Sequence, residues 1–171
     1  MKKILILLTG VIIFIFQSNV QAQTNVSDSR YDFKLSLPSG WSKSGSEETS
    51  NKDAISYSFD KSDGKNAIML LAFKVNTPKN LEDLIYTLEK DVTLNIPSRS
   101  GSFTSIDVAG MEGKKATYKD DNFVETIYYF STDDPGNDNY AYMLRFITAS
   151  SYFNSGVESE IDDIVNSFRR N

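Results

Sequence analysis

The chain has 171 residues, with 18 basic and 23 acidic side chains, eleven Phe, nine Tyr, one Trp, and neither Cys nor His. Without Cys and His it has no thiol nucleophile, no imidazole base, no Ser-His-Asp triad and no His-ligated zinc. It also has no disulfides, so its stability must come from burial of a core, for which the aromatic residues provide material.

The first 22 residues have the pattern of a secretory signal peptide. Met1-Lys2-Lys3 is a short positive start, residues 4–16 are almost wholly apolar, and cleavage after Ala22 would place Val20 at −3 and Ala22 at −1. A membrane anchor is the alternative, but an apolar helix of about 13 residues spans only about 20 Å, short of the roughly 30 Å hydrocarbon core. The absence of Cys excludes lipid attachment at the cleavage site. We therefore expect an exported protein, periplasmic or extracellular, with no stable membrane insertion after cleavage.

The chain that remains has the size and charge of one acidic domain. Removal of 22 residues from 171 leaves 149, and loss of Lys2 and Lys3 leaves 16 basic against 23 acidic side chains, a net charge of −7. Such a protein lacks the basic patch that is typical of nucleic-acid binding. We expect a flexible polar lead-in over 23–30, a single domain over 31–171, and no nucleic-acid partner.

The first half of this domain has the alternation of β-strands. Residues 31–37 are apolar at odd and polar at even positions, which predicts a half-buried strand that ends at the turn Pro38-Ser39-Gly40. Trp41 follows, and we expect it to close an edge of the sheet; stacking on a ligand is the alternative. Residues 42–53 are polar without a period and predict a loop. Strands are predicted at 54–59 and 67–75, and the second is apolar enough to be central and covered on both faces.

The second half contains two amphipathic helices. Leu81, Leu84, Ile85, Leu88 and Val92 have helical spacing, with Asn80 as the expected N-cap. Strands are predicted at 103–108, 114–118, 124–130 and 140–148. A last helix runs to about Phe168, and Ser155 with Glu158 has the spacing of a capping box. Its apolar stripe comprises Val157, Ile161, Ile164, Val165 and Phe168.

This order of elements predicts an α+β fold. The links between strands are short and turn-like, so the sheet should be mainly antiparallel. Two helices and a strand that is apolar on both faces predict helices on both faces of the sheet, an α/β/α sandwich. The strand at 140–148 and the helix after it should form the centre of that arrangement.

Five features, in chain order, resemble a known superfamily. They are the aromatic strand with Pro-x-Gly-Trp over 31–41, the helix at Leu81 after a buried strand, the glycine turn over 108–114, the aromatic hairpin of 125–130 with 140–148, and the closing helix that ends Asn166-Ser167-Phe168. Over about residues 31–168 the chain resembles the PsbP/Mog1-like superfamily, including its small secreted bacterial members. The resemblance implies an antiparallel sheet between helices. Members are mostly accessory or binding proteins, among them photosystem subunits and a partner of a nuclear-transport GTPase, so no functional residue is carried over.

Acidic turns are the sharpest candidates for chemistry. Asp133, Asp134 and Asp138 with Asn137 and Asn139 form an oxygen-rich segment, and Ca²⁺ takes six to eight oxygen ligands. The spacing is not that of an EF-hand, however, and Pro135-Gly136 is typical of a hairpin tip, so a plain solvated turn is preferred. A joint acidic rim would form if the tips of other hairpins met this turn. The further residues of that rim would be Asp60, Asp63, Asp120 and Asp121.

Five tyrosines lie on adjacent predicted strands: Tyr118, Tyr128, Tyr129, Tyr140 and Tyr142. They would form core on one face of the sheet and, on the other, an exposed platform for a peptide or lipid. Alternation places Tyr128 and Tyr129 on opposite faces, so one of them could be exposed. The placement in the core is preferred.

We expect an exported, non-enzymatic accessory or binding protein without a cofactor. It would bind a protein, a peptide or a small apolar ligand through a face of the sheet or a groove beside a helix. The alternatives are a hydrolase that uses carboxylates or a Ser, and an acidic Ca²⁺-binding module. No spacing of carboxylates singles out a catalytic pair, so no catalytic, cofactor-binding or metal-binding residue is assigned. Glu158, Glu160, Asp162 and Asp163 are assigned to the solvent side of the last helix.

Overall fold

The computed structural model describes residues 23–75, 81–135 and 138–171. The predicted signal peptide and the predicted N-cap Asn80 therefore lie outside the described residues. Among the residues described, neither helix is long and apolar enough to cross a membrane. In chain order the elements are β1 (Thr24–Asp28), β2 (Phe33–Leu37), β3 (Trp41–Glu48), β4 (Ala54–Lys61), β5 (Asn66–Val75), α1 (Leu81–Lys90), β6 (Ser98–Arg99), β7 (Thr104–Val108), β8 (Met111–Lys119), β9 (Phe123–Ser131), β10 (Asn139–Ala149), a 3₁₀ turn (Ser150–Tyr152) and α2 (Ser155–Ser167).

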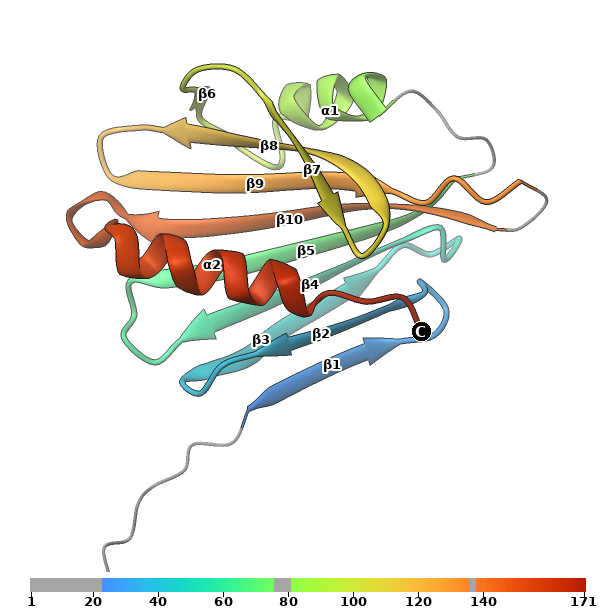
Figure 1. Cartoon of the computed structure of the whole chain (residues 1–171), viewed down its shortest axis with the longest axis horizontal. Helices are drawn as coiled ribbons and strands as arrows, with labels where there is room; N and C mark the ends of the chain where they lie inside the picture. The colour runs from blue at the N-terminus through green and yellow to red at the C-terminus, as the bar shows by residue number, and fades with distance from the viewer. Residues whose placement is uncertain (1–22, 76–80, 136–137) are drawn as a thin grey trace, which may run out of the picture.

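The strands form an eight-stranded sheet and a separate two-stranded ribbon (Figure 1). The order in the sheet is β3-β4-β5-β10-β9-β8-β6, and β7 also pairs with β8. Every pair of strands is antiparallel. The predicted strand at 140–148 is confirmed as β10, which lies between β5 and β9 in the middle of the sheet.

Side chains alternate between two apolar cores on opposite faces of the sheet. On one face, Phe130, Tyr142 and Leu144 pack with the β1–β2 ribbon and α2. On the other face, Ile127, Tyr129 and Met143 pack with α1 and with residues of the segment that follows it. The alternating strand predicted over 31–37 is confirmed over Phe33–Leu37 as β2, with Phe33, Leu35 and Leu37 buried on the inner side of the ribbon. Tyr31 is also buried but lies in the turn before β2.

The predicted α/β/α sandwich is wrong. The molecule is mostly antiparallel strand, with a large eight-stranded sheet and, in the described chain, only two α-helices. One face is covered by the β1–β2 ribbon together with α2, and the other carries the single ten-residue α1 and the irregular segment after it. Neither face therefore has the layer of helices that the prediction required. An apolar face of a sheet does not require a layer of helices, because on the α2 face the β1–β2 ribbon provides part of the cover.

Two predictions near the N-terminus are also wrong. The polar lead-in over 23–30 contains β1, and the loop predicted over 42–53 contains most of β3. Both strands are held by backbone pairing to one neighbour. β3 has mostly exposed side chains and β1 buries only Val26, so neither shows an apolar period. Trp41 begins the edge strand β3 and is buried, with Nε1 donating to Glu160 Oε1 at 2.7 Å, which confirms its place at the edge of the sheet.

The cap of α2 is one residue earlier than predicted. The side chain of Asn154, not Ser155, accepts hydrogen bonds from the backbone N–H groups of Gly156 at 2.9 Å and Val157 at 3.2 Å. Ser155 is instead the first residue of the helix.

A buried ion pair lies on the α1 face, and sequence reasoning missed it. Arg145 on β10 donates from Nε to Glu125 Oε2 at 2.8 Å and from Nη2 to Glu125 Oε1 at 2.7 Å, a bidentate contact. Both side chains are less than a tenth exposed. Arg145 Nη1 also donates to the carbonyl of Leu94 at 2.6 Å. The pair therefore fixes the segment after α1 to the sheet.

The β7–β8 hairpin is curled tightly against β9. Its turn consists of Ala109 and Gly110, with φ of 54° and 82°, the left-handed geometry of a two-residue hairpin. A Cβ on Gly113 would lie 2.6 Å from the carbonyl oxygen of Tyr129 and 2.9 Å from Phe130 Cβ. Only glycine therefore permits this approach of β8 to β9.

We expect Gly113→Ala to lower the free energy of unfolding by about 2 kcal/mol, because backbone must move to admit the methyl group. Urea denaturation measures the change. Gly45→Ala is the matched control, since the nearest atom to its Cβ would be Ser58 Cβ at 4.0 Å. An equal effect of the two substitutions would contradict the tight approach at Gly113.

We expect Glu125→Ala to lower the free energy of unfolding by about 3 kcal/mol, because it leaves the Arg145 guanidinium buried without a counter-charge. Arg30→Ala serves as control, since it removes an exposed partner of Glu48 and should have a much smaller effect on stability. The double substitution Glu125→Leu with Arg145→Met should recover most of the loss. If the single variant were as stable as the control, the pair would not anchor this segment.

Candidate functional site

The five tyrosines that formed a candidate platform are all buried. Tyr128 and Tyr129 do lie on opposite faces, but each is covered, Tyr128 in the α2-side core and Tyr129 in the α1-side core. Tyr128 donates its hydroxyl proton to Asp162 at 2.8 Å, and Tyr118 donates to Glu89 at 2.7 Å. The core prediction is confirmed, and the exposed platform is wrong.

The acidic turn after β9 is organised by a buried side chain. Asn139 Oδ1 accepts from the backbone N–H of Asp134 at 2.8 Å and from Thr132 Oγ1 at 3.0 Å. The carboxylate of Asp134 pairs with Arg170. Asn137 lies outside the described residues, and within those described no group of three or more acidic side chains is placed to hold a metal ion. The described side chains of this turn thus cap its backbone.

The joint acidic rim is wrong because the turns lie at two ends of the sheet. The turn between β4 and β5 and the turn between β8 and β9 both meet the end of β10, through Ala149 N–H to Lys65 O at 3.0 Å and Ser150 N–H to Asn122 O at 2.8 Å. The turn after β9 lies at the other end of β10 (Figure 1). Asp63 and Asp120 each accept hydrogen bonds from backbone N–H groups of their own turns.

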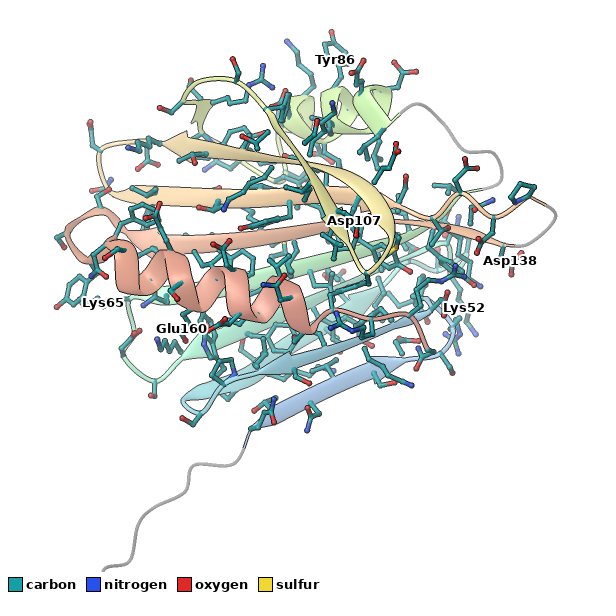
Figure 2. The ribbon with its side chains drawn as sticks, viewed as in Figure 1. Lys52, Lys65, Tyr86, Asp107, Asp138 and Glu160 are labelled. Carbon is teal, nitrogen blue, oxygen red and sulfur yellow. The ribbon has the colours of Figure 1, made fainter. Side chains whose placement is uncertain are left out.

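Two of the four carboxylates assigned to the solvent side of α2 also anchor the helix; of these, Asp162 is exposed as predicted, whereas Glu160 is half-buried. Glu160 accepts from Trp41 Nε1 and from Lys61 Nζ at 2.5 Å, and it lies on the side of α2 toward β3 and β4 (Figure 2). Asp162 accepts from Tyr128 and from Lys115 Nζ at 3.1 Å. Partial burial opposes ionisation of Asp162, but these two donors lower its pKa below the ordinary value. Glu158 and Asp163 are exposed, as predicted.

An apolar stripe on the α1 face is a candidate binding surface. On β5, Ile68, Leu70 and Ala72 are fully buried on the α2 side, whereas the alternate residues are only half-buried on the α1 side. These alternate residues, Met69, Leu71 and Phe73, form the apolar stripe. The prediction that this strand is covered on both faces is therefore incomplete on the α1 side.

The stripe lies beside α1 and not under its buried residues. Ile85 and Leu88 of α1 pack in the core that contains Ile127 and Tyr129 of β9. On the neighbouring strand β4, Ser56 is paired with Leu71 of the stripe. Tyr86 projects from the outer side of α1, away from the sheet (Figure 2). In the described chain α1 is the only helix on this face, so the stripe has less cover than the apolar residues of the α2 face.

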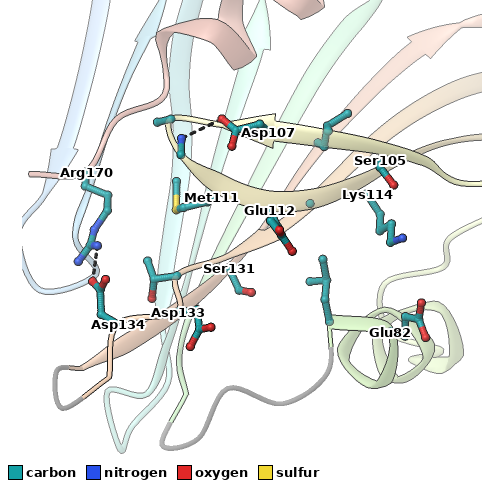
Figure 3. A pocket seen from close by; sticks show the side chains of 16 residues that line it. Glu82, Ser105, Asp107, Met111, Glu112, Lys114, Ser131, Asp133, Asp134 and Arg170 are labelled. Carbon is teal, nitrogen blue, oxygen red and sulfur yellow. Dashed lines mark hydrogen bonds and ion pairs between the residues drawn. The ribbon is translucent and has the colours of Figure 1, made fainter.

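A cleft of about 930 Å³ lies at the end of the sheet where β9 ends (Figure 3). It is bounded by the β7–β8 hairpin, the end of β9 with the residues after it, the start of α1, and the C-terminal segment. Five carboxylates and two cationic side chains line it: Glu82, Asp107, Glu112, Asp133, Asp134, Lys114 and Arg170.

The charged groups of the cleft differ in their pairing. Arg170 donates from Nε to Asp32 at 2.5 Å and also pairs with Asp134, and its hydrogen bonds to these two carboxylates raise its pKa. Ser105 and Ser131 line the cleft as well, and in the described chain neither hydroxyl is hydrogen-bonded to a basic side chain. The arrangement thus assembles no nucleophile and base among these residues.

Burial raises the pKa of Tyr129 to about 12 and raises the pKa of Tyr142 further. The folded chain therefore keeps protons that unfolded tyrosines release near pH 10, so the free energy of unfolding should fall as the pH rises above about 10. Denaturation at pH values from about 8 to about 12, with tyrosinate absorbance as a second signal, measures this. Tyr129→Phe should reduce the slope. Full ionisation near pH 10 in a still-folded protein would show that the hydroxyls are not buried.

Comparison with known proteins identifies a shared fold. No family model matches the chain, and no curated protein matches it. A crystal structure from Bacteroides thetaiotaomicron matches with a TM-score of 0.52 and 15% identity, over 88% of this chain and 49% of that one, so the chain spans about half of that protein. LpqN, described as involved in cell envelope biogenesis of Mycobacterium tuberculosis, matches with a TM-score of 0.53 and 13% identity, over 86% of this chain and 90% of LpqN. At these identities the likeness shows the fold alone, which this chain shares with both proteins.

Proposed function

We propose that this chain is an exported accessory or binding protein of a bacterial cell envelope, with a distant PsbP/Mog1-like relationship and no catalytic activity. Its partner, a protein segment or a small apolar ligand, is held against the apolar stripe. The pattern of the first 22 residues supports export. The fold shared with LpqN, which is described as involved in cell envelope biogenesis, supports the location.

The observation that carries this proposal is the incomplete cover of the stripe. Met69, Leu71 and Phe73 are large apolar side chains in the interior strand β5, and they remain half-buried on the α1 face. Incompletely covered apolar surface on a sheet face is typical of an interaction site. Complete burial of one such side chain is worth roughly 1.5–3 kcal/mol, so covering the smaller part that is still exposed on three of them provides on the order of 1–2 kcal/mol toward binding.

Binding is supported over hydrolysis by the state of the polar groups. Carboxylates that make close contacts, such as Glu48, Asp63 and Asp162, have pKa values lowered by hydrogen bonds from their neighbours, although partial burial opposes this. A general acid requires the opposite shift, a carboxyl that keeps its proton near neutral pH. These groups therefore serve to hold turns and elements in place.

Leu71→Gln tests the proposal, with Val92→Gln as matched control because Val92 is 89% exposed and lies outside the stripe. The chain from Gln23, immobilised, is exposed to extract of its own source, and retained proteins are identified by mass spectrometry; binding of the neutral dye N-phenylnaphthylamine is measured in parallel. We expect one protein or the dye to be retained by wild type and control and to bind about tenfold more weakly to Leu71→Gln.

Melting temperatures of all three proteins confirm that the comparison is made between folded chains. Equal retention by the three proteins would exclude the stripe as the binding surface. Absence of any retained partner, together with turnover of ester, peptide or phosphate substrates by the purified chain, would favour the hydrolase alternative.

A further inference from the structure

The second edge of β2 is closed by the residues that follow α2. Strand β2 is paired along its length with β1, and this ribbon is separate from the eight-stranded sheet. On its other side, the N–H of Lys34 donates to the carbonyl of Arg169 at 2.7 Å, and the N–H of Arg169 donates to the carbonyl of Lys34 at 3.0 Å. In Figure 1 the chain leaves α2 and ends beside the ribbon. Residues 169–171, which we call the strap, therefore act as a short third strand of the ribbon.

The side chains of the strap extend this contact. Arg170 donates from Nε to Asp32 at 2.5 Å, and its Nη1 pairs with Asp134 (Figure 3). The backbone N–H of Asn171 donates to Asp32 Oδ1 at 3.1 Å, and its side-chain Nδ2 donates to the carbonyl of Phe33 at 2.9 Å. The edge of β2 thus holds an extended backbone whose cationic side chain lies between two carboxylates from different turns.

The strap is held by hydrogen bonds and ion pairs. Phe168, which precedes it, is fully buried in the α2-side core and stacks on Phe33 with ring centroids 5.9 Å apart. Residues 169–171 are exposed and belong to neither core. Exposed ion pairs are individually weak and are screened by salt. Release of the strap would therefore remove no member of either core, while Phe168 keeps the end of α2 packed against the ribbon.

The strap lies between the edge of β2 and the cleft at the end of β9. Arg170 and Asp134 both line this cleft, whose volume is about 930 Å³ (Figure 3). Asp32 lies in the turn between β1 and β2. A strap that leaves β2 therefore joins the cleft to the open edge of that strand, with space for a few residues of an extended chain.

We propose that the edge of β2 at Lys34 docks an extended segment of a partner protein, and that the strap is the autoinhibitory occupant of this site. The strap itself shows the chemistry that the site takes: a backbone N–H and C=O for Lys34, and a Lys or Arg side chain for Asp32 and Asp134. Addition of a strand to an open edge is a common mode of peptide recognition. The site lies on the α2 face and is separate from the apolar stripe.

Hydrogen exchange tests whether the strap opens while the ribbon stays folded. The N–H of Lys34 is bonded to the strap, whereas alternation along the strand turns the N–H of Leu35 toward β1. We expect the amide of Lys34, corrected for intrinsic rates, to exchange at least about tenfold faster than that of Leu35, and Arg170→Ala to raise the rate at Lys34 alone. Arg99→Ala is the matched control, since Arg99 forms an ion pair of similar exposure with Glu89 of α1. Equal exchange at the two amides would mean that the strap opens only with the whole ribbon, and would overturn the proposal.

Peptide binding tests the docking site itself. The probe is the synthetic peptide Ala-Arg-Arg-Asn-Ala, which carries the sequence of the strap. The control peptide is N-methylated at its first Arg, so it keeps the charge and loses the donor to the carbonyl of Lys34. Binding is followed by chemical shifts in the chain from Gln23 and in a variant that lacks residues 169–171. Because the strap must leave before the probe binds, we expect the shortened chain to bind the probe at least about tenfold more tightly than the intact chain, and the control peptide at least about tenfold more weakly than the probe.

The melting temperature of the shortened chain shows whether it is folded, and if it is not, Arg170→Ala takes its place with an affinity between those of the intact and shortened chains. Equal affinity of the intact and opened chains for the probe, equal affinity of the two peptides, or no binding at millimolar probe would overturn the proposal. Because no residue of the stripe is changed, this result is independent of the Leu71→Gln test.

Discussion

The two-sided pairing of β10 is the constraint on which the rest of the structure depends. This strand is paired with β5 over Asn139–Thr148 and with β9 over Ala141–Ala149, so nearly all of its backbone groups are satisfied by neighbours on both sides. Its side chains then alternate into two separate cores, Tyr142 and Leu144 toward α2, and Met143 and Arg145 toward α1. Because β10 contributes side chains to both cores, neither face of the sheet can be rearranged without the other.

Both candidate surfaces arise where that sheet is incompletely covered or sharply bent. The buried residues of α1 lie over β9, which leaves the stripe on β5 beside the helix and not beneath it. On the other side of α1, the β7–β8 hairpin approaches β9 closely at Gly113, and the same hairpin bounds the cleft at the end of β9. Leu81 packs with the α1-side core and also lines the cleft. The first turn of α1 therefore stands between the two surfaces.

Elements with strong apolar periodicity were predictable, and those held by backbone pairing or side-chain geometry were not. Strand β2 and helix α2 followed from spacing alone, because burial of one face selects their residues. Strand β3 exposes most of its side chains and β1 buries only Val26, so their pairing left no period in the sequence. The ion pair of Arg145 with Glu125 has only a weak signal in the sequence: one basic residue within the apolar strand β10 and one acidic residue within the apolar strand β9. The start of β8 at Met111, where a strand is predicted only from 114, depends on a turn of two residues whose length the sequence did not define.

The α1 face is covered mainly on the side of β9, and this leaves the stripe partly exposed. Ile85 and Leu88 of α1 pack in the core that β9 lines, and Arg145 holds the segment after α1 to the sheet through the carbonyl of Leu94. The stripe packs against the same core and is only partly buried. A partner that completed the cover of the stripe would therefore gain apolar burial without displacing the helix.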